Sequence, residues 1–306
     1  MGLEAARADS VEGDQVAIAI THGLLGSHLG IVYRDGDDKQ KLLHLAFHRL
    51  LLDEDFPCAD PWAVLKLALP EWRLVQVIAL IRKLSKKYVL GRNSVVTYGI
   101  NLYAGIDAIK EDMTYELGQD GDGLTCASFV AAAFKAIGSP LVNLPTWEYD
   151  QINEIWGRAV VCMLRVYNAD SKHIEKVESN INGLRLRPEE VVAGAELLDP
   201  KNPAEFKDVQ LRAPEIIKEM IAICGAPTEE SAGQFDPCVQ QYKKEMLAAK
   251  NAQEPAHKSQ TDAESKEATD GNSDLAGSIQ ALASDEASAN AQNFLGHADD
   301  VDNGLN

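Results

Sequence analysis

The sequence predicts an α+β fold in which an antiparallel sheet packs on helices. Within residues 43–48, three apolar side chains alternate with His44, Ala46 and His48, which is the period of two expected for a strand. Residues 71–87 and 126–137 instead carry apolar side chains three to four positions apart, which is typical of one face of a helix. Both periodicities recur along one chain, so strands and helices are expected to share a core.

The N-terminal third is expected to supply the strands. Residues 15–20 and 29–33 are short apolar runs, and the second ends at the turn-forming residues 35–38. Because 29–33 and 43–48 flank a short turn, they are expected to form an antiparallel hairpin. That hairpin would place His28 near His44 or His48.

The remaining elements are predicted from helix boundaries and short apolar runs. Pro70 precedes the helix at 71–87, which ends in basic residues, and Gly138 stops the helix that begins at Cys126. Further expectations are a strand at 160–166, a half-exposed strand with solvated arginines at 184–187, a helix starting at 187–190, and a helix at 214–222 with Pro214 in its first turn.

Size and charge limit the function classes. The chain has 306 residues, 45% of them hydrophobic, and a net charge of −18. This acidity argues against nucleic acid or an anionic membrane as the main partner, because both attract basic surfaces. It favours a basic or neutral substrate.

The chain is expected to divide into a folded domain at 1–245 and an acidic tail at 246–306. Residues 251–306 contain 11 acidic and 2 basic residues and one aromatic residue, so they can bury little apolar surface. We expect a disordered tail with a transient helix near 275–289, which could tether a protein partner.

The five cysteines, at positions 58, 126, 162, 224 and 238, are scattered and form no C-x-x-C pair. This pattern predicts neither a disulfide framework nor a zinc knuckle, and it favours a reducing compartment. The acidic N-terminus does not resemble a signal peptide, and no apolar run approaches the roughly 20 residues of a membrane span. A cytoplasmic location is expected, or export by a secretion system that needs no signal.

Cys126 is the candidate nucleophile because it falls where a polar turn becomes a helix. Backbone N–H groups and the helix dipole stabilise a thiolate at such a position, and the N–H of Cys126 could bind an oxyanion. His28 would take the thiol proton and His44 would orient its ring, with His48 as an equal alternative to His44. A buried core cysteine and solvated histidines are the competing structural interpretation.

Residues 27–33, Ser-His-Leu-Gly-Ile-Val-Tyr, and 42–44, Leu-Leu-His, resemble the histidine strand and the next strand of the NlpC/P60 papain-like superfamily. Residues 122–130, Asp-Gly-Leu-Thr-Cys-Ala-Ser-Phe-Val, resemble its nucleophile helix. The order, histidine before cysteine, is that of the circularly permuted branch. The resemblance implies a papain-like fold with Cys126 as nucleophile, His28 as base and His44 as the orienting residue.

The expected function is therefore a cysteine-dependent hydrolase that cleaves an amide, isopeptide or thioester bond through a covalent acyl-thiol intermediate, without a cofactor. The alternative is a catalytically idle papain-like module that binds a peptide or a protein partner. A third hypothesis is a zinc site built from Cys126, His28 and either His44 or His48. Arg185 and Arg187 could hold a substrate carboxylate, but their alternation with leucines more simply predicts solvent exposure.

Overall fold

Six antiparallel strands form one sheet in the order β1-β6-β2-β3-β4-β5. The computed structural model describes residues 2–7, 9–13, 15–23, 25–36, 39–91, 94–199, 201–226 and 237–249. The strands are β1 (Glu4–Ala5), β2 (Ala17–Gly23), β3 (Gly26–Arg34), β4 (Gln40–Phe47), β5 (Leu50–Asp55) and β6 (Ala63–Lys66). The antiparallel sheet predicted from the alternating runs is confirmed.

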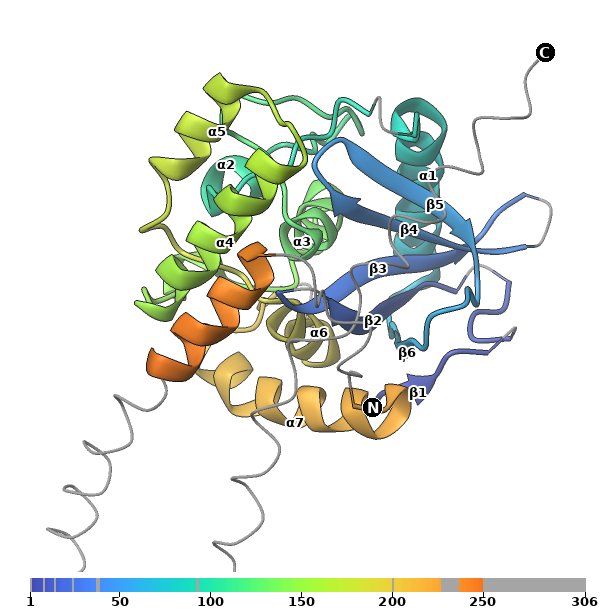
Figure 1. Ribbon diagram of the computed structural model, residues 1–306. Helices are drawn as coiled ribbons and strands as arrows, with labels where there is room; N and C mark the ends of the chain where they lie inside the picture. The colour runs from blue at the N-terminus through green and yellow to red at the C-terminus, as the bar shows by residue number, and fades with distance from the viewer. Residues whose placement is uncertain are drawn as a thin grey trace, which may run out of the picture.

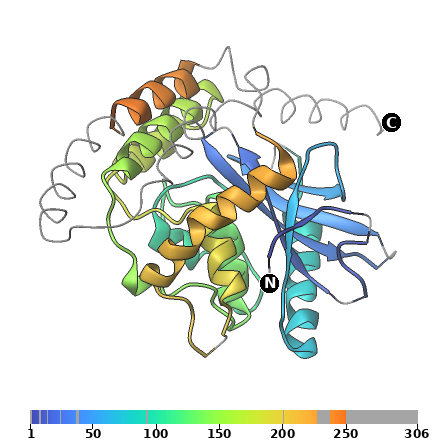
Figure 2. The same cartoon turned by 90° about the horizontal axis from the view of Figure 1, so that it is seen from below.

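The helices follow the sheet in the chain. They are α1 (Glu71–Tyr88), α2 (Leu102–Ile106), α3 (Cys126–Ala136), α4 (Ile152–Val166), α5 (Ser171–Glu178), α6 (Pro188–Glu196) and α7 (Phe206–Cys224), with a 3-10 turn, η1 (Leu144–Thr146), between α3 and α4. Figure 1 shows α3 beside the sheet, and Figure 2 shows α7 running alongside α6. The predicted helices at 71–87, at Cys126 and at 187–190 are confirmed.

The two faces of the sheet are covered differently. The face that carries Leu29 and Leu43 packs against the helices, where Phe129 and Phe134 of α3 are fully buried. The other face carries Val32 and a smaller apolar cluster that includes Phe56 and Trp62. Because successive strand residues point to opposite faces, His28 lies on the side of the smaller cluster while Leu29 points toward α3.

The hairpin prediction is confirmed by the register of β3 and β4. Ile31 pairs with Leu43 and Arg34 pairs with Gln40, in an antiparallel ladder. The residue before Ile31 in β3 must be glycine. A Cβ on Gly30 would lie 2.5 Å from the Leu42 side chain and 2.9 Å from the Cβ of His44. The missing side chain of Gly30 leaves room for Leu42 and for the Cβ of His44.

Three predicted elements were wrong. Residues 160–166 are the last turns of α4 and not a strand, because Val160 and Val161 lie on the buried face of a longer helix that starts at Ile152. Pro214 lies inside α7, which begins eight residues earlier, and so does not start it. Residues 184–187 form an irregular connection into α6 and not a strand.

A disulfide joins Cys162 of α4 to Cys238, which corrects the prediction of unpaired cysteines. Cys238 is the second residue of a helical segment at 237–249, drawn in orange beside α4 in Figure 1. Arg158 of α4 also forms an ion pair with Glu245, at 2.8 Å. Disulfides persist in oxidising compartments, so this bond argues against the reducing compartment that the scattered cysteines suggested.

We expect reduction of this disulfide to lower the free energy of unfolding by about 2–4 kcal/mol, because the bond closes a loop of 76 residues. Urea unfolding with and without dithiothreitol measures the difference. Cys238→Ala should be insensitive to dithiothreitol, whereas Cys58→Ala, which removes a free thiol, should respond as the wild type does. Equal unfolding midpoints of the oxidised and reduced wild type would contradict the prediction.

The segment at 237–249 carries four residues of the predicted tail, 246–249, into the described helix. The rest of the predicted disordered tail, including the transient helix near 275–289, lies outside the described residues. Among the helices that the structure describes, none is long and apolar enough to cross a membrane.

Candidate active site

The helix start at Cys126 is fixed by a capping box. The Thr125 side chain accepts a hydrogen bond from the Ser128 N–H at 3.1 Å, and the Ser128 hydroxyl accepts one from the Thr125 N–H at 2.7 Å. These two bonds satisfy backbone donors that the first helical turn leaves unpaired. Cys126 is therefore held as the first helical residue, where the sequence predicted it.

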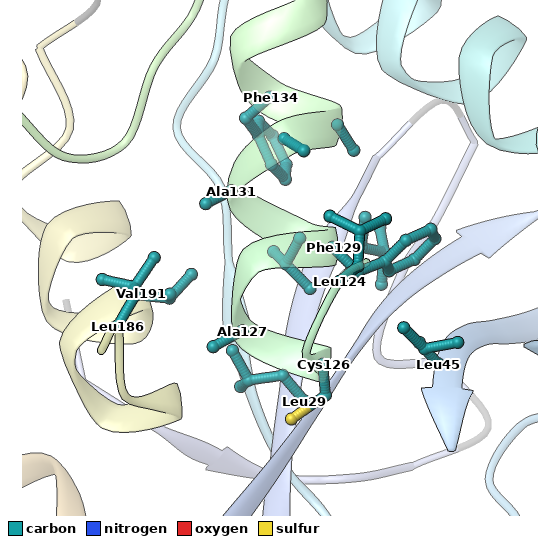
Figure 3. Packing of buried hydrophobic residues seen from close by; sticks show 14 of the residues in the cluster. Leu29, Leu45, Leu124, Cys126, Ala127, Phe129, Ala131, Phe134, Leu186 and Val191 are labelled. Atoms are coloured by element: carbon teal, nitrogen blue, oxygen red, sulfur yellow. The ribbon is translucent and has the colours of Figure 1, made fainter. Parts of the chain in front are cut away.

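The Cys126 thiol points toward the strand that carries Leu29 (Figure 3). The nearby backbone N–H groups of Leu29 and Ala127 favour the thiolate form of its sulfur. Only 7% of the residue is exposed. In the part of the chain that the structure describes, no hydrogen bond joins this thiol to the ring of His28.

Burial decides the protonation state of this thiol. Desolvation raises the pKa of Cys126 to about 11, although the two backbone N–H donors and the charge of Arg185 act in the opposite direction. The sequence predicted a stabilised thiolate from the helix start alone. That prediction is wrong for the protein without a substrate, because desolvation outweighs the helix start.

His28 and His44 are in direct contact. The Nε2 atom of His28 lies 2.8 Å from Nδ1 of His44, and Nε2 of His44 lies 2.9 Å from Oε2 of Glu54 on β5. The Trp62 ring lies edge-on to both imidazoles, with centroids 5.8 and 6.0 Å away. The structure thus places a partly exposed carboxylate and two buried imidazoles in one hydrogen-bonded chain.

This chain assigns the ring tautomers. A carboxylate oxygen only accepts, so His44 donates its Nε2–H to Glu54, and in a neutral His44 ring Nδ1 is then an acceptor. His28 donates its Nε2–H to that acceptor. The basic nitrogen of a neutral His28 is therefore Nδ1.

His28 is a neutral base at neutral pH. Burial, and next the neighbouring His44, hold its pKa well below the usual value of 6.5. A neutral imidazole and a neutral thiol therefore coexist in this protein over the neutral pH range.

His48, the alternative to His44, occupies a different position. Its Nδ1 accepts a hydrogen bond from the Tyr98 N–H at 3.3 Å, and its ring centroid lies 4.7 Å from that of His173. Burial, followed by the charges of His173 and Arg49, lowers the pKa of His48 to about 4. Between the two candidates, the structure places His44 against His28.

A cavity of about 910 Å³ brings the candidate residues to one surface. His28 and Cys126 both line it, together with His48, Trp156 and Arg185. Among the described residues, no cluster of three or more His, Cys, Asp or Glu side chains could hold a metal ion. The zinc hypothesis therefore has no ligand set in this part of the chain.

Glu54 was not among the residues predicted from the sequence, and for Arg185 the sequence favoured solvent exposure over a role in substrate binding. A signal for Glu54 was present, since it stands at the end of an apolar run that pairs with the strand of His44. Arg185 was assigned to a solvated strand, but it lines the cavity and stacks on Trp156. Trp147 is buried and donates its indole N–H to Glu190 at 3.3 Å, so it anchors a loop.

No family model matches this sequence, and comparisons with curated proteins and with solved structures give no match.

Proposed function

We propose that this protein is a thiol hydrolase that cleaves an amide, isopeptide or thioester bond through an acyl-thiol intermediate on Cys126. The observation that carries this proposal is the hydrogen-bonded chain from Glu54 through His44 to His28. A carboxylate that fixes one imidazole, which in turn fixes another, is how a base is held in one tautomer for proton transfer.

The proposed reaction has two steps. The Cys126 sulfur attacks the acyl carbon while its proton passes to Nδ1 of His28, and the leaving group departs with that proton. Water then attacks the acyl-thiol, His28 accepts a proton from this water, and the thiol regains a proton as it leaves. The backbone N–H of Cys126 at the helix start is our candidate donor to the oxyanion.

Proton transfer is expected to accompany the attack, because the resting pair is neutral. The pKa of Cys126 is about 11 and that of His28 is lowered well below 6.5, so few molecules hold a thiolate beside an imidazolium. A hydrogen bond between the thiol and Nδ1 is required only when substrate is bound, and such bonds are often longer or absent in free enzymes.

The resemblance of residues 27–33, 42–44 and 122–130 to the permuted NlpC/P60 papain-like superfamily supports the same roles. The six-stranded antiparallel sheet and the helix that starts at Cys126 are compatible with a papain-like fold. Our proposal extends the resemblance by adding Glu54 as the residue that positions His44.

A second candidate function is a catalytically idle module that binds a peptide or protein partner. The burial of Cys126 and the pKa of about 11 favour it, since an inert core thiol has both properties. In that case the cavity binds its ligand without covalent chemistry.

The pH dependence of acetylation by p-nitrophenyl acetate separates the two candidates. Each cysteine is followed by mass spectrometry from pH 7 to 10. Cys224 is the internal control, because burial raises its pKa to about 11 as well, while its thiol contacts the Thr21 side chain and the backbone of Ala63.

A thiol that reacts only as a preformed thiolate gains about tenfold in rate per pH unit up to its pKa. Cys224 should follow this rise. Cys126 should instead react at a rate that changes little between pH 7 and 10, because neutral His28 removes the proton during attack. If Cys126 rises in parallel with Cys224, the hydrolase proposal fails and the binding module is the better account.

A further inference from the structure

Arg185 is held in place on the cavity wall. It lies in the connection between α5 and α6, and its guanidinium carbon sits 4.0 Å from the centroid of the Trp156 ring of α4. Its Nη2 atom lies 3.9 Å from the position that a Cβ on Gly26 would occupy, at the turn into the strand of His28. Stacking on an aromatic ring fixes the plane of a guanidinium and leaves its edge for hydrogen bonding.

The charge of Arg185 is not balanced by a carboxylate of this chain. Within the described residues, no Asp or Glu lies at ion-pair distance from it, although the protein carries 47 acidic residues. Arg187, two residues later, binds Asp150 at 2.6 Å. The Nε atom of Arg185 is buried and has no hydrogen-bond partner, which is costly for a charged donor.

Acidic side chains on the same cavity wall are already engaged. Asp120 forms an ion pair with Lys172 at 2.5 Å, and Asp170 caps α5 by accepting from the Lys172 and His173 N–H groups. Arg185 and Cys126 line the same cavity. An anion bound by Arg185 would therefore lie in the cavity that holds the nucleophile.

We propose that Arg185 binds a carboxylate group of the substrate, so that the cavity takes an acyl compound bearing a carboxylate near the bond cleaved by Cys126. A guanidinium edge with unused donors matches a carboxylate, which accepts two parallel hydrogen bonds. The proposal rests on the proposed hydrolase function for its choice of bond. It replaces the expectation of a basic or neutral substrate, because Arg185 on the cavity wall has no carboxylate partner among the described residues.

Two alkylating reagents test this site without a known substrate. The sulfur of a cysteine displaces iodide from either iodoacetate or iodoacetamide and forms a thioether, and the two reagents differ chiefly in the carboxylate. The pKa and the accessibility of a thiol affect both alkylation rates in nearly the same way. The ratio of the two rates at one cysteine is therefore nearly independent of these two properties. We expect the iodoacetate-to-iodoacetamide ratio at Cys126 to exceed the ratio at Cys224 by about tenfold.

Arg185→Gln should remove this preference, and Arg185→Lys should keep part of it, since the charge remains while the planar donor edge is lost. Arg158→Gln is the matched control, because it deletes the same charge at a surface ion pair with Glu245. Circular dichroism confirms that each variant is folded. An unchanged ratio in folded Arg185→Gln overturns the proposal.

A direct titration covers the case in which Cys126 reacts too slowly with both reagents. The Nε–H signal of Arg185, assigned by its absence in Arg185→Gln, is followed by NMR with N-acetylglycine and with neutral N-acetylglycinamide. Saturable shifts with the acid alone support the site, and equal responses to both compounds refute it. Neither measurement requires catalysis, so the carboxylate site and the hydrolase proposal succeed or fail separately.

Discussion

Replacing His28 with alanine is expected to slow the acetylation of Cys126 at pH 7.5 by about a thousandfold. The reason is that a thiol with a pKa of about 11 is almost entirely protonated at this pH, and His28 is the proposed acceptor of its proton. The variant should also gain a new pH profile, in which the rate rises about tenfold per pH unit, as at Cys224.

His48→Ala is the matched control for His28→Ala. His48 lines the same cavity, but its ring contacts the Tyr98 N–H and His173 and not the His28 chain. We expect the rate of Cys126 acetylation in the His48→Ala variant to stay within about threefold of the wild-type rate. Equal losses in both variants would mean that the cavity as a whole, and not a proton acceptor, sets the reactivity.

Gly123→Ala is expected to lower the free energy of unfolding by about 3 kcal/mol or more. A Cβ at this position would lie 2.6 Å from the Gly99 N atom and 2.7 Å from the Thr97 carbonyl oxygen. Both are backbone atoms, and Thr97 also accepts a hydrogen bond from the Leu124 N–H at 2.9 Å. The chain cannot move apart here without breaking the contact that holds the loop before Cys126.

Urea unfolding measures this loss, and Gly36→Ala is its control. A Cβ on Gly36 would meet no atom within 4 Å, so that substitution should change the free energy of unfolding by less than about 0.5 kcal/mol. A stable Gly123→Ala protein with wild-type acetylation at Cys126 would show that the loop can relax around the added methyl group.

Local patterns were sufficient for the sheet and for the helix start. The alternation in 43–48 predicted the strand that carries His44, and the hairpin predicted its approach to His28. A polar turn followed by helical spacing predicted that Cys126 begins a helix, and the capping box of Thr125 and Ser128 explains this start. These features depend on residues close together in the chain.

Local patterns failed where packing overrides propensity. The β-branched residues at 160–166 favour a strand in isolation, yet they belong to a helix whose buried face includes Trp156 and Val160. The Cys162–Cys238 disulfide was also beyond reach, because its partners are 76 residues apart and no spacing rule joins them.

Local sequence patterns were enough to identify the side chains that can carry the chemistry: a cysteine at a helix start and two histidines on paired strands. Their protonation depends on the folded structure, because desolvation raises the pKa of Cys126 and lowers that of His28. It also decided that Glu54 joins His44 and that Arg185 lacks a carboxylate partner among the described residues. The burial and the electrostatic environment of a site depend on residues from distant parts of the chain, so a local sequence pattern cannot predict them.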